Sequence, residues 1–227
     1  MEYKDLGGCS INESISIYNC DCMDLLKRTP DNYYSLAIVD PPYGIDVTKM
    51  TLGNGKKKIN RGTSDWDNKT PDNEYFNELR RVSKNQIIWG ANYMTGNLPP
   101  SMGWIYWDKG TGANDFSDGE LAYTSFNRAL RAYKISWVGA NANNGTPRIH
   151  PTEKPVKLYE WILSRYAEPN QKILDTHLGS GSIAIAIDNV NKIEKMNLTL
   201  TACELDPDYF KAAMKRIEQQ TAQQTIF

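Results

Sequence analysis

The sequence is poor in the residues that bind metals and form cross-links. Its 227 residues include four cysteines and two histidines, and none of Cys9, Cys20, Cys22 and Cys203 forms a C-x-x-C pair. Structural zinc sites need several closely spaced thiolate and imidazole ligands, and disulfide frameworks are typical of secreted proteins. We therefore expect no metal site and no disulfide, which favours a cytoplasmic protein.

Long hydrophobic runs and a strong net charge are lacking as well. No apolar run approaches the roughly 20 residues needed to span a bilayer, and residues 1–5 do not begin a signal peptide. The 26 basic and 27 acidic residues give a net charge of −1. This balance excludes a uniformly basic surface, so any contact with a polyanion is expected to be local. We expect no contact with a membrane.

What the sequence does contain is typical of a globular α/β protein. Hydrophobic residues make up 40% of the chain and aromatic residues 11%, and apolar runs alternate with amphipathic segments. This alternation predicts a doubly wound, mostly parallel sheet. Residues 1–14 are expected to be a weakly ordered lead-in and 46–70 a long loop. The expected strands are 14–19, 35–39, 86–89, 103–109, 120–126, 134–138, 172–175 and 198–204, and the expected helices are 23–27, 72–83, 156–167 and the segment from the glycine turn to about 191.

One buried strand ends abruptly at Asp40-Pro-Pro-Tyr43. Pro41 and Pro42 lack amide donors and have a fixed φ, so the strand must stop there. Asp40 is then left at the carboxyl edge of the sheet, where open α/β folds bind ligands. Its carboxylate and the proline carbonyls are acceptors beside the flat face of Tyr43, which suits a planar amino group such as that of adenine or cytosine. A plain Pro-Pro turn capped by Asp40 is the alternative.

A second strand that ends in an acid, residues 172–175, leads into a glycine turn and a helix. The next strand ends at Glu204, which is placed to accept hydrogen bonds from ribose hydroxyls. The pattern Gly179-x-Gly181-x-x-Ala alone fits a dinucleotide equally well. S-adenosylmethionine differs in carrying an α-amino acid tail, and Asp175 and Lys154 can supply the carboxylate and the cation that such a tail needs.

Together these motifs resemble the amino-directed DNA methyltransferases, which methylate adenine N6 or cytosine N4 using S-adenosylmethionine. Asp40–Tyr43 is similar to their catalytic motif, Asp175–Ser182 to their glycine-rich cofactor motif, and 150–155 to the segment that closes over the methionine tail. The catalytic motif comes first, as in the β order of the family. Thr176-His177 replaces the family's usual Pro-Phe, and His177 is expected to fill the aromatic position with its imidazole hydrogen-bonded.

The resemblance implies a Rossmann-like methyltransferase fold in a single domain, residues 1–227. Within it, 15–109 is the expected catalytic half, 110–148 a small target-recognition insertion and 149–220 the cofactor-binding half. The implied catalytic residues are Asp40, Pro41, Pro42 and Tyr43. The residues expected to contact S-adenosylmethionine are Asp21, Cys22, Asp40, Thr152, Glu153, Lys154, Pro155, Asp175, Thr176, His177, Leu178, Gly179, Ser180, Gly181, Ser182, Glu204 and Leu205.

The implied chemistry is direct methyl transfer to a base turned out of the duplex. Asp40 and the Pro41 carbonyl accept the amino hydrogens, and Tyr43 stacks on the base. Adenine N6 is favoured because the cytosine-N4 group more often has Ser where Asp40 stands. Cytosine-N4 methylation, RNA methylation, a catalytically idle DNA- or cofactor-binding module and a NAD oxidoreductase are the alternatives.

The expected partner is double-stranded DNA, and a homodimer is left open. Two segments carry basic residues that suit phosphates or guanines, the loop at 46–70 and the insertion at 110–148. An ordinary solvated surface explains the same charges about equally well. The residues expected to contact DNA are Lys56, Lys57, Lys58, Arg61, Arg128, Arg131, Lys134 and Arg148.

Overall fold

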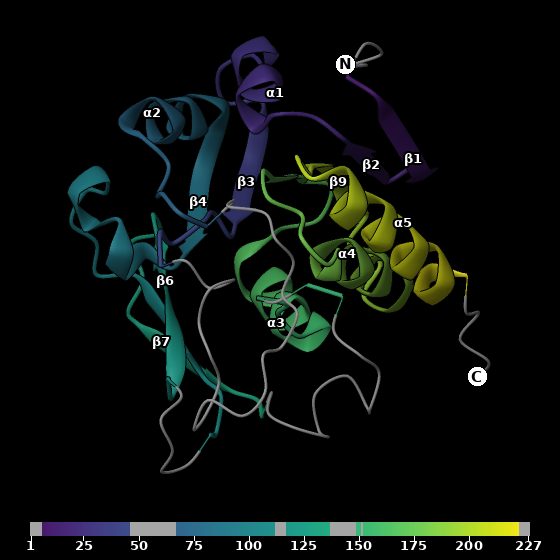
Figure 1. Ribbon diagram of the computed structural model, residues 1–227. Coiled ribbons are helices and arrows are strands. Elements are labelled where there is room, and N and C mark those ends of the chain that lie inside the picture. The colour runs from purple at the N-terminus through teal and green to yellow at the C-terminus, as the bar shows by residue number, and fades with distance from the viewer. Residues whose placement is uncertain (1–5, 46–66, 112–116, 137–148, 151, 223–227) are drawn as a thin grey trace, which may run out of the picture.

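The computed structural model describes residues 6–45, 67–111, 117–136, 149–150 and 152–222. Within these ranges nine strands form one sheet, in the order β1-β2-β9-β8-β3-β4-β6-β5-β7 (Figure 1). The strands are β1 (Gly8–Asn12), β2 (Ile15–Tyr18), β3 (Tyr34–Val39), β4 (Ser83–Trp89), β5 (Trp104–Asp108), β6 (Gly119–Thr124), β7 (Arg131–Lys134), β8 (Lys172–Asp175) and β9 (Thr199–Cys203).

Most neighbouring strands are parallel, which confirms the predicted doubly wound α/β fold. The pairs β2–β9, β9–β8, β8–β3, β3–β4 and β5–β7 are parallel, whereas β1–β2, β4–β6 and β6–β5 are antiparallel. β6 therefore runs against its neighbours, and its first residues lie at the edge where the parallel strands end.

Different helices cover the two faces of the sheet (Figure 1). α1 (Cys22–Arg28) and α2 (Asn73–Val82) pack on one face, and α3 (Val156–Tyr166), α4 (Ser182–Ile193) and α5 (Pro207–Thr221) on the other. The alternation along β3 shows the two faces: Leu36 and Ile38 pack with α3–α5, and Ala37 and Val39 with α1 and α2. Burial on both faces explains why this strand is continuously apolar. None of the described helices is both long and apolar enough to cross a membrane.

The sheet brings the two sequence motifs to the same place. β3 and β8 are adjacent and parallel, with Leu36 opposite Ile173 and Ala37 opposite Leu174. From this pair the sheet grows in opposite directions, through β4 on one side and β9 on the other. This is the topological switch point at which doubly wound sheets bind ligands, and both Asp40 and the glycine turn follow it directly.

Three elements differ from the prediction. β1 lies in the expected lead-in as an exposed edge strand paired with β2, and its sequence has no apolar alternation that would reveal it. The strand expected at 134–138 is instead β7, which ends at Lys134. α5 was not predicted, although Asp206 caps its first turn, Pro207 is its first residue, and apolar residues follow at helical spacing.

Candidate active site

A cavity of about 420 Å³ lies above the carboxyl ends of β3, β8 and β9. This volume is within the usual range for small-molecule sites. Asp40 and Pro42 from the first motif line it together with the glycine turn and Glu204, so the two motifs share one cavity. The lining residues are Cys20, Asp21, Cys22, Asp40, Pro42, His150, Thr152, Glu153, Lys154, Tyr159, Thr176, His177, Leu178, Gly179, Ser180, Ser182, Glu204, Leu205, Asp206, Pro207 and Tyr209.

The turn after β3 is held from two sides. The buried carboxylate of Asp67 accepts hydrogen bonds from the backbone amides of Tyr43, at 2.7 Å, and Gly44, at 3.1 Å. On the other side, the Tyr43 ring lies against Gly90, whose φ is +65° and where an added Cβ would come within 2.0 Å of the ring. Tyr93 stacks on Tyr43 with ring centroids 5.3 Å apart. These contacts fix the turn that presents Asp40.

The Asp40 carboxylate is engaged through both oxygens. The Tyr43 hydroxyl donates to Oδ1 over 2.7 Å, and the Lys154 ammonium donates to Oδ2 over 2.5 Å. Burial raises the pKa of Asp40 above its ordinary value, and the nearby Glu120 carboxylate raises this pKa further, whereas Lys154 opposes the shift. Lys154 was expected to serve the methionine carboxylate; in this structure its ammonium is held by Asp40 and Glu120.

Glu204, at the tip of β9, anchors the glycine turn. Its Oε2 accepts from the Gly179 amide at 2.9 Å, and its Oε1 accepts from the Asp206 amide at 3.0 Å. A carboxylate has about four lone-pair directions, so Glu204 retains acceptor capacity toward the cavity that it lines. Gly179 and Gly181 have φ of +54° and +77°, a backbone conformation that glycine adopts without strain.

Asp175 ends β8, and His177 follows it at the start of the glycine turn. Burial raises the pKa of Asp175 to about 8, although its carboxylate accepts from the His177 amide at 3.0 Å. The His177 imidazole is hydrogen-bonded to Thr176 at 2.9 Å and meets the edge of the Tyr75 ring, as expected for a residue that fills an aromatic position. Burial lowers the pKa of His177 to about 4, so the ring is neutral near pH 7.

The segment 150–155 is fastened to the glycine turn by Arg216 of α5. Its guanidinium donates to the Ser180 carbonyl at 2.7 Å and to the Ser182 hydroxyl at 2.9 Å, and it lies 3.4 Å from the Glu153 carboxylate. The Glu153 side chain is completely buried, and the Arg216 side chain is 12% exposed. Two walls of the cavity are therefore joined by one side chain from the C-terminal helix.

Nearly all the residues predicted to bind cofactor line this cavity. Of the predicted cofactor-binding positions, Pro155, Asp175 and Gly181 do not line it, and of the predicted catalytic residues Pro41 and Tyr43 do not. Asp175 is buried behind Thr176 and His177, and Gly181 packs on Ile217 of α5. His150, which also lines the cavity, belongs to the predicted segment 150–155. The lining residues Cys20, Tyr159 and Tyr209 were not predicted, and neither were the supporting residues Asp67, Glu120 and Arg216.

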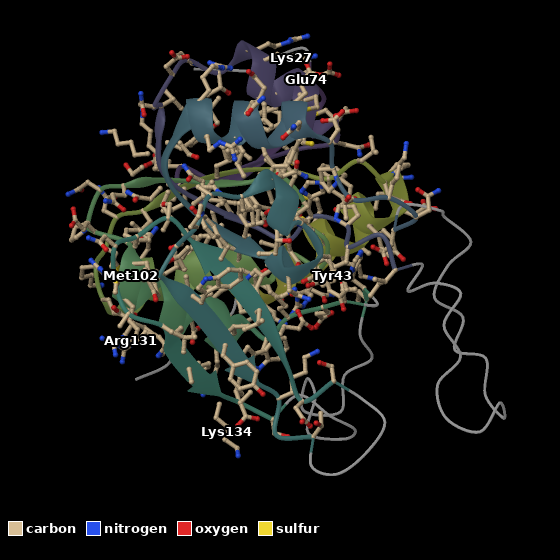
Figure 2. The ribbon with its side chains drawn as sticks, turned by 90° about the vertical axis from the view of Figure 1, so that its left-hand side faces the viewer. Lys27, Tyr43, Glu74, Met102, Arg131 and Lys134 are labelled. Carbon is tan, nitrogen blue, oxygen red and sulfur yellow. The ribbon has the colours of Figure 1, made fainter. Side chains whose placement is uncertain are left out.

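Of the residues expected to contact DNA, the three that the structure describes do not line the cavity. Arg128 donates to the Arg165 carbonyl at the end of α3 that lies away from the cavity. Arg131 lies well apart from Tyr43, and Lys134 ends β7 with its side chain 73% exposed (Figure 2). Lys56, Lys57, Lys58, Arg61 and Arg148 lie outside the described residues.

The lining suits a cationic nucleoside ligand. Five carboxyl groups and one lysine are found among the described lining residues, and two of the carboxyl groups already have a cationic partner. A positively charged sulfonium with an α-ammonium group would be stabilised in such a cavity, and Glu204 offers acceptors for a ribose. The donor set therefore fits S-adenosylmethionine.

Comparison with known proteins identifies the family. Residues 100–215 match the N6/N4 methyltransferase family model, described as DNA methylase, and this match covers just over half of the chain. The chain belongs to this family of DNA methyltransferases, whose members use S-adenosylmethionine.

Individual relatives agree with this assignment. Two type II methyltransferases of Moraxella bovis are similar: M2.MboI is 24% identical over 78% of this chain and 80% of its own, and M1.MboII is 21% identical over 87% and 94%. Among solved structures, the M1.HpyAVI–SAM complex has a TM-score of 0.56 at 18% identity, covering 89% of this chain and 98% of its own. The cytosine-N4-specific PvuII DNA methyltransferase has a TM-score of 0.57 at 14% identity, covering 95% and 89%. These structural likenesses show that the fold is shared.

Proposed function

We propose that this DNA methyltransferase acts on adenine N6 in duplex DNA, on a base turned out of the helix into the cavity. The observation that carries the proposal is that Asp40 lines the same cavity as the glycine turn and Glu204. A methyl acceptor held at Asp40 would lie beside a donor held at the glycine turn. The Asp at this position favours adenine, because the cytosine-N4 group of the family more often has Ser there.

S-adenosylmethionine supplies a methyl group that is activated by the positive charge on its sulfur. The chain's part is to hold the cofactor and to orient the acceptor. Glu204 accepts from the ribose hydroxyls, and the carboxyl groups around the cavity balance the cofactor's positive charge. His177 forms a neutral wall beside the amino acid tail, because its pKa of about 4 keeps the imidazole uncharged near pH 7.

Asp40 and the Pro41 carbonyl prepare the amino group for attack. The adenine amine is a poor nucleophile because its lone pair is delocalised into the ring. Two acceptors that bind its two hydrogens draw the nitrogen toward tetrahedral geometry and direct the lone pair at the methyl group. The Asp40 carboxylate also stabilises the positive charge that develops on the nitrogen, an interaction stronger in the transition state than in the ground state.

Target recognition is proposed for the segment 110–148. Of its described basic residues, Lys134 has an exposed ammonium suited to a phosphate. For Arg128 the hydrogen bond to Arg165 provides an alternative, structural role. Exchange of residues 110–148 with those of a relative of known target should transfer the recognised sequence, and an unchanged target would contradict this placement.

The test of the function is to identify the modified base. Duplex DNA is incubated with the protein and methyl-labelled S-adenosylmethionine, and its nucleosides are separated by mass spectrometry. Labelled N6-methyldeoxyadenosine supports the proposal, N4-methyldeoxycytidine shows the cytosine alternative, and label found only with an RNA substrate refutes duplex DNA as the target. Asp40→Ala should abolish transfer while cofactor binding persists, and continued transfer by this variant would refute the role of Asp40.

A further inference from the structure

The Lys154 ammonium lies between two carboxylates at the centre of the site. It is 2.5 Å from Asp40 Oδ2 and 3.1 Å from Glu120 Oε2, and its side chain is 1% exposed. The rings of Tyr43 and Trp89 lie beneath it, with centroids at 5.7 Å and 5.2 Å. Burial alone would lower the pKa of Lys154, but the two carboxylates more than offset this effect and raise it. Lys154 is therefore a buried cation that contacts two carboxylates at once and also donates to the Tyr43 hydroxyl at 3.2 Å.

Glu120 is held in place to act as the second partner. Its Oε1 accepts from the Lys109 ammonium at 2.5 Å, which leaves Oε2 for Lys154 and for the Tyr43 hydroxyl at 3.3 Å. Burial would raise the pKa of Glu120, but Lys154 and Lys109 outweigh it and lower the pKa to about 2. Glu120 thus remains ionised, and two carboxylates face two ammonium groups in a balanced network.

The proposed reaction needs an acceptor on Asp40, and each oxygen of Asp40 already accepts one hydrogen bond. The ammonium donates a short, charge-assisted hydrogen bond to Oδ2, and Tyr43 occupies Oδ1. A base amino group is a neutral donor and competes poorly with an ammonium for the same oxygen. An ammonium that stays on Oδ2 therefore weakens the hold of Asp40 on the amino group, and leaving the ammonium buried without a partner would be strongly unfavourable.

We propose that Glu120 is a positioning residue that draws the Lys154 ammonium off Asp40 as the base amino group arrives. The proposal rests on the function proposed above and deepens it. Since the ammonium is already within 3.1 Å of Glu120 Oε2, a small movement completes the transfer and Lys154 is paired throughout. Lys109 holds the Glu120 carboxylate in place. The charge balance of the network is therefore maintained while the base amino group replaces Lys154 as the donor to Asp40.

The first test is Glu120→Gln, which keeps the shape of the side chain and removes its charge. Asp40 is then the only carboxylate that pairs with the Lys154 ammonium, and the ammonium competes with the base for it. We expect the single-turnover rate of methyl transfer, with cofactor prebound and DNA saturating, to fall about 10- to 100-fold, the range typical of one hydrogen bond to a charged group. The dissociation constant of S-adenosylmethionine, measured by calorimetry, should stay within about twofold, the scatter expected of a change remote from the ligand.

Glu74→Gln is the matched control. Glu74 also forms an ion pair, with Lys27 at 2.8 Å, but both side chains are more than half exposed and lie far from Tyr43 (Figure 2). This variant should transfer methyl groups at the wild-type rate. Glu120→Asp, which retains the charge, should recover part of the rate lost in Glu120→Gln.

The pH profile separates positioning from a merely structural role. The ionisable groups around Asp40 are Lys154 and Tyr43, which are in direct contact with it, and Glu120, which acts through its charge. Burial raises the pKa of Asp175 and of Tyr159, and the charge of Asp40 raises both further. Loss of the Glu120 charge removes a repulsion and lowers the Asp40 pKa, so the acid limb of the rate profile should move to lower pH in Glu120→Gln. Lys154→Met removes an attraction and should move this limb to higher pH. A merely structural defect would lower the rate at every pH by the same factor and would leave the pH of the acid limb unchanged.

The outcomes distinguish this proposal from the function on which it rests. If Glu120→Gln keeps both the wild-type rate and the wild-type acid limb, Glu120 has no positioning role, even where Asp40→Ala is inactive. If Asp40→Ala retains transfer, the proposed function itself is wrong. If Glu120→Gln does not fold, the Lys154→Met profile decides the question, since an unmoved acid limb there overturns the proposal.

Discussion

The strongest single test of the cavity's construction is the removal of Arg216. Arg216→Met takes away the hydrogen bonds to Ser180 and Ser182 and the ion pair with the fully buried Glu153. Removal of one partner of a buried ion pair costs about 3–5 kcal/mol, and we take the lower end, about 3 kcal/mol, because Arg216 is partly exposed and the pair is long. For a chain of this size such a loss lowers the midpoint of thermal unfolding by roughly 6–12 °C.

Cofactor binding should weaken as well, because the segment 150–155 is no longer joined to the glycine turn. We expect the dissociation constant of S-adenosylmethionine to rise about tenfold, as for the loss of one positioning contact. The assays are calorimetry for binding and thermal unfolding followed by circular dichroism. Lys27→Met is the control, because Lys27 belongs to an ion pair at the exposed surface, and such pairs contribute little to stability.

A double-mutant cycle with Glu153→Gln isolates the ion pair. If the buried pair matters, the double variant loses less stability than the sum of the single variants, by about 1 kcal/mol or more. Additive losses, or an unfolding midpoint within about 2 °C of wild type for Arg216→Met, would refute the argument that α5 ties the two walls together.

Three further predictions concern the buried groups around the cavity. Burial raises the pKa of Asp175 to about 8 in the folded chain, above its unfolded value of 3.8, so the fold loses stability as the pH rises from 3.8 to about 8. Asp175→Asn should therefore raise the thermal unfolding midpoint at pH 8, and an unchanged midpoint there would contradict this. Gly90→Ala places a methyl group on the Tyr43 ring at a positive φ, and we expect methyl transfer to fall at least about tenfold, measured in single turnover beside cofactor binding. Asp67→Ala leaves the Tyr43 and Gly44 amides without their acceptor, which should lower the free energy of unfolding in urea by about 1–3 kcal/mol. Wild-type stability together with wild-type activity would show that these two hydrogen bonds are dispensable.

The site residues at the ends of parallel strands could be predicted from the sequence. Asp40, Asp175 and Glu204 each end an apolar run, and in a parallel sheet such ends meet at one edge. Their local patterns were therefore sufficient to predict that Asp40 and Glu204 would share a cavity. The helix and strand types followed from the same periodicities, with errors where the apolar pattern is weak, as in β1 and β7.

Glu120 was missed for a different reason. It lies at the start of β6, and in a parallel strand that position would be at the opposite edge of the sheet from Asp40. β6 is antiparallel to β4 and β5, so its start lies at the cavity edge instead. Whether a strand is parallel or antiparallel to its neighbours cannot be determined from its own sequence. No local sequence pattern could therefore predict that Glu120 lies beside Lys154.

Arg216 and Asp67 illustrate contacts that depend on the tertiary structure. Arg216 sits on a helix whose capping signal, Asp206-Pro207, was present in the sequence, so the helix was predictable. Its guanidinium reaches Glu153 only because α5 packs beside α4, an arrangement set by the whole fold. Asp67 reaches the amides of Tyr43 and Gly44 across a long intervening segment, and nothing near Tyr43 in the sequence indicates which acid will do so.

The placement of acids at three neighbouring strand ends has an electrostatic consequence. Burial raises the pKa of Asp40, Asp175 and Glu204 alike, and repulsion between carboxyl groups adds to each shift. Each acid is thus costly to ionise in the free protein, and a bound cation relieves that cost. Lys154 provides such a cation in direct contact with Asp40, and its charge also opposes the shift of the Asp175 pKa. The sulfonium and ammonium groups of the cofactor would add positive charge beside the acids that line the cavity. This accounts for a cluster of acids at one edge of the sheet in a chain with almost no net charge.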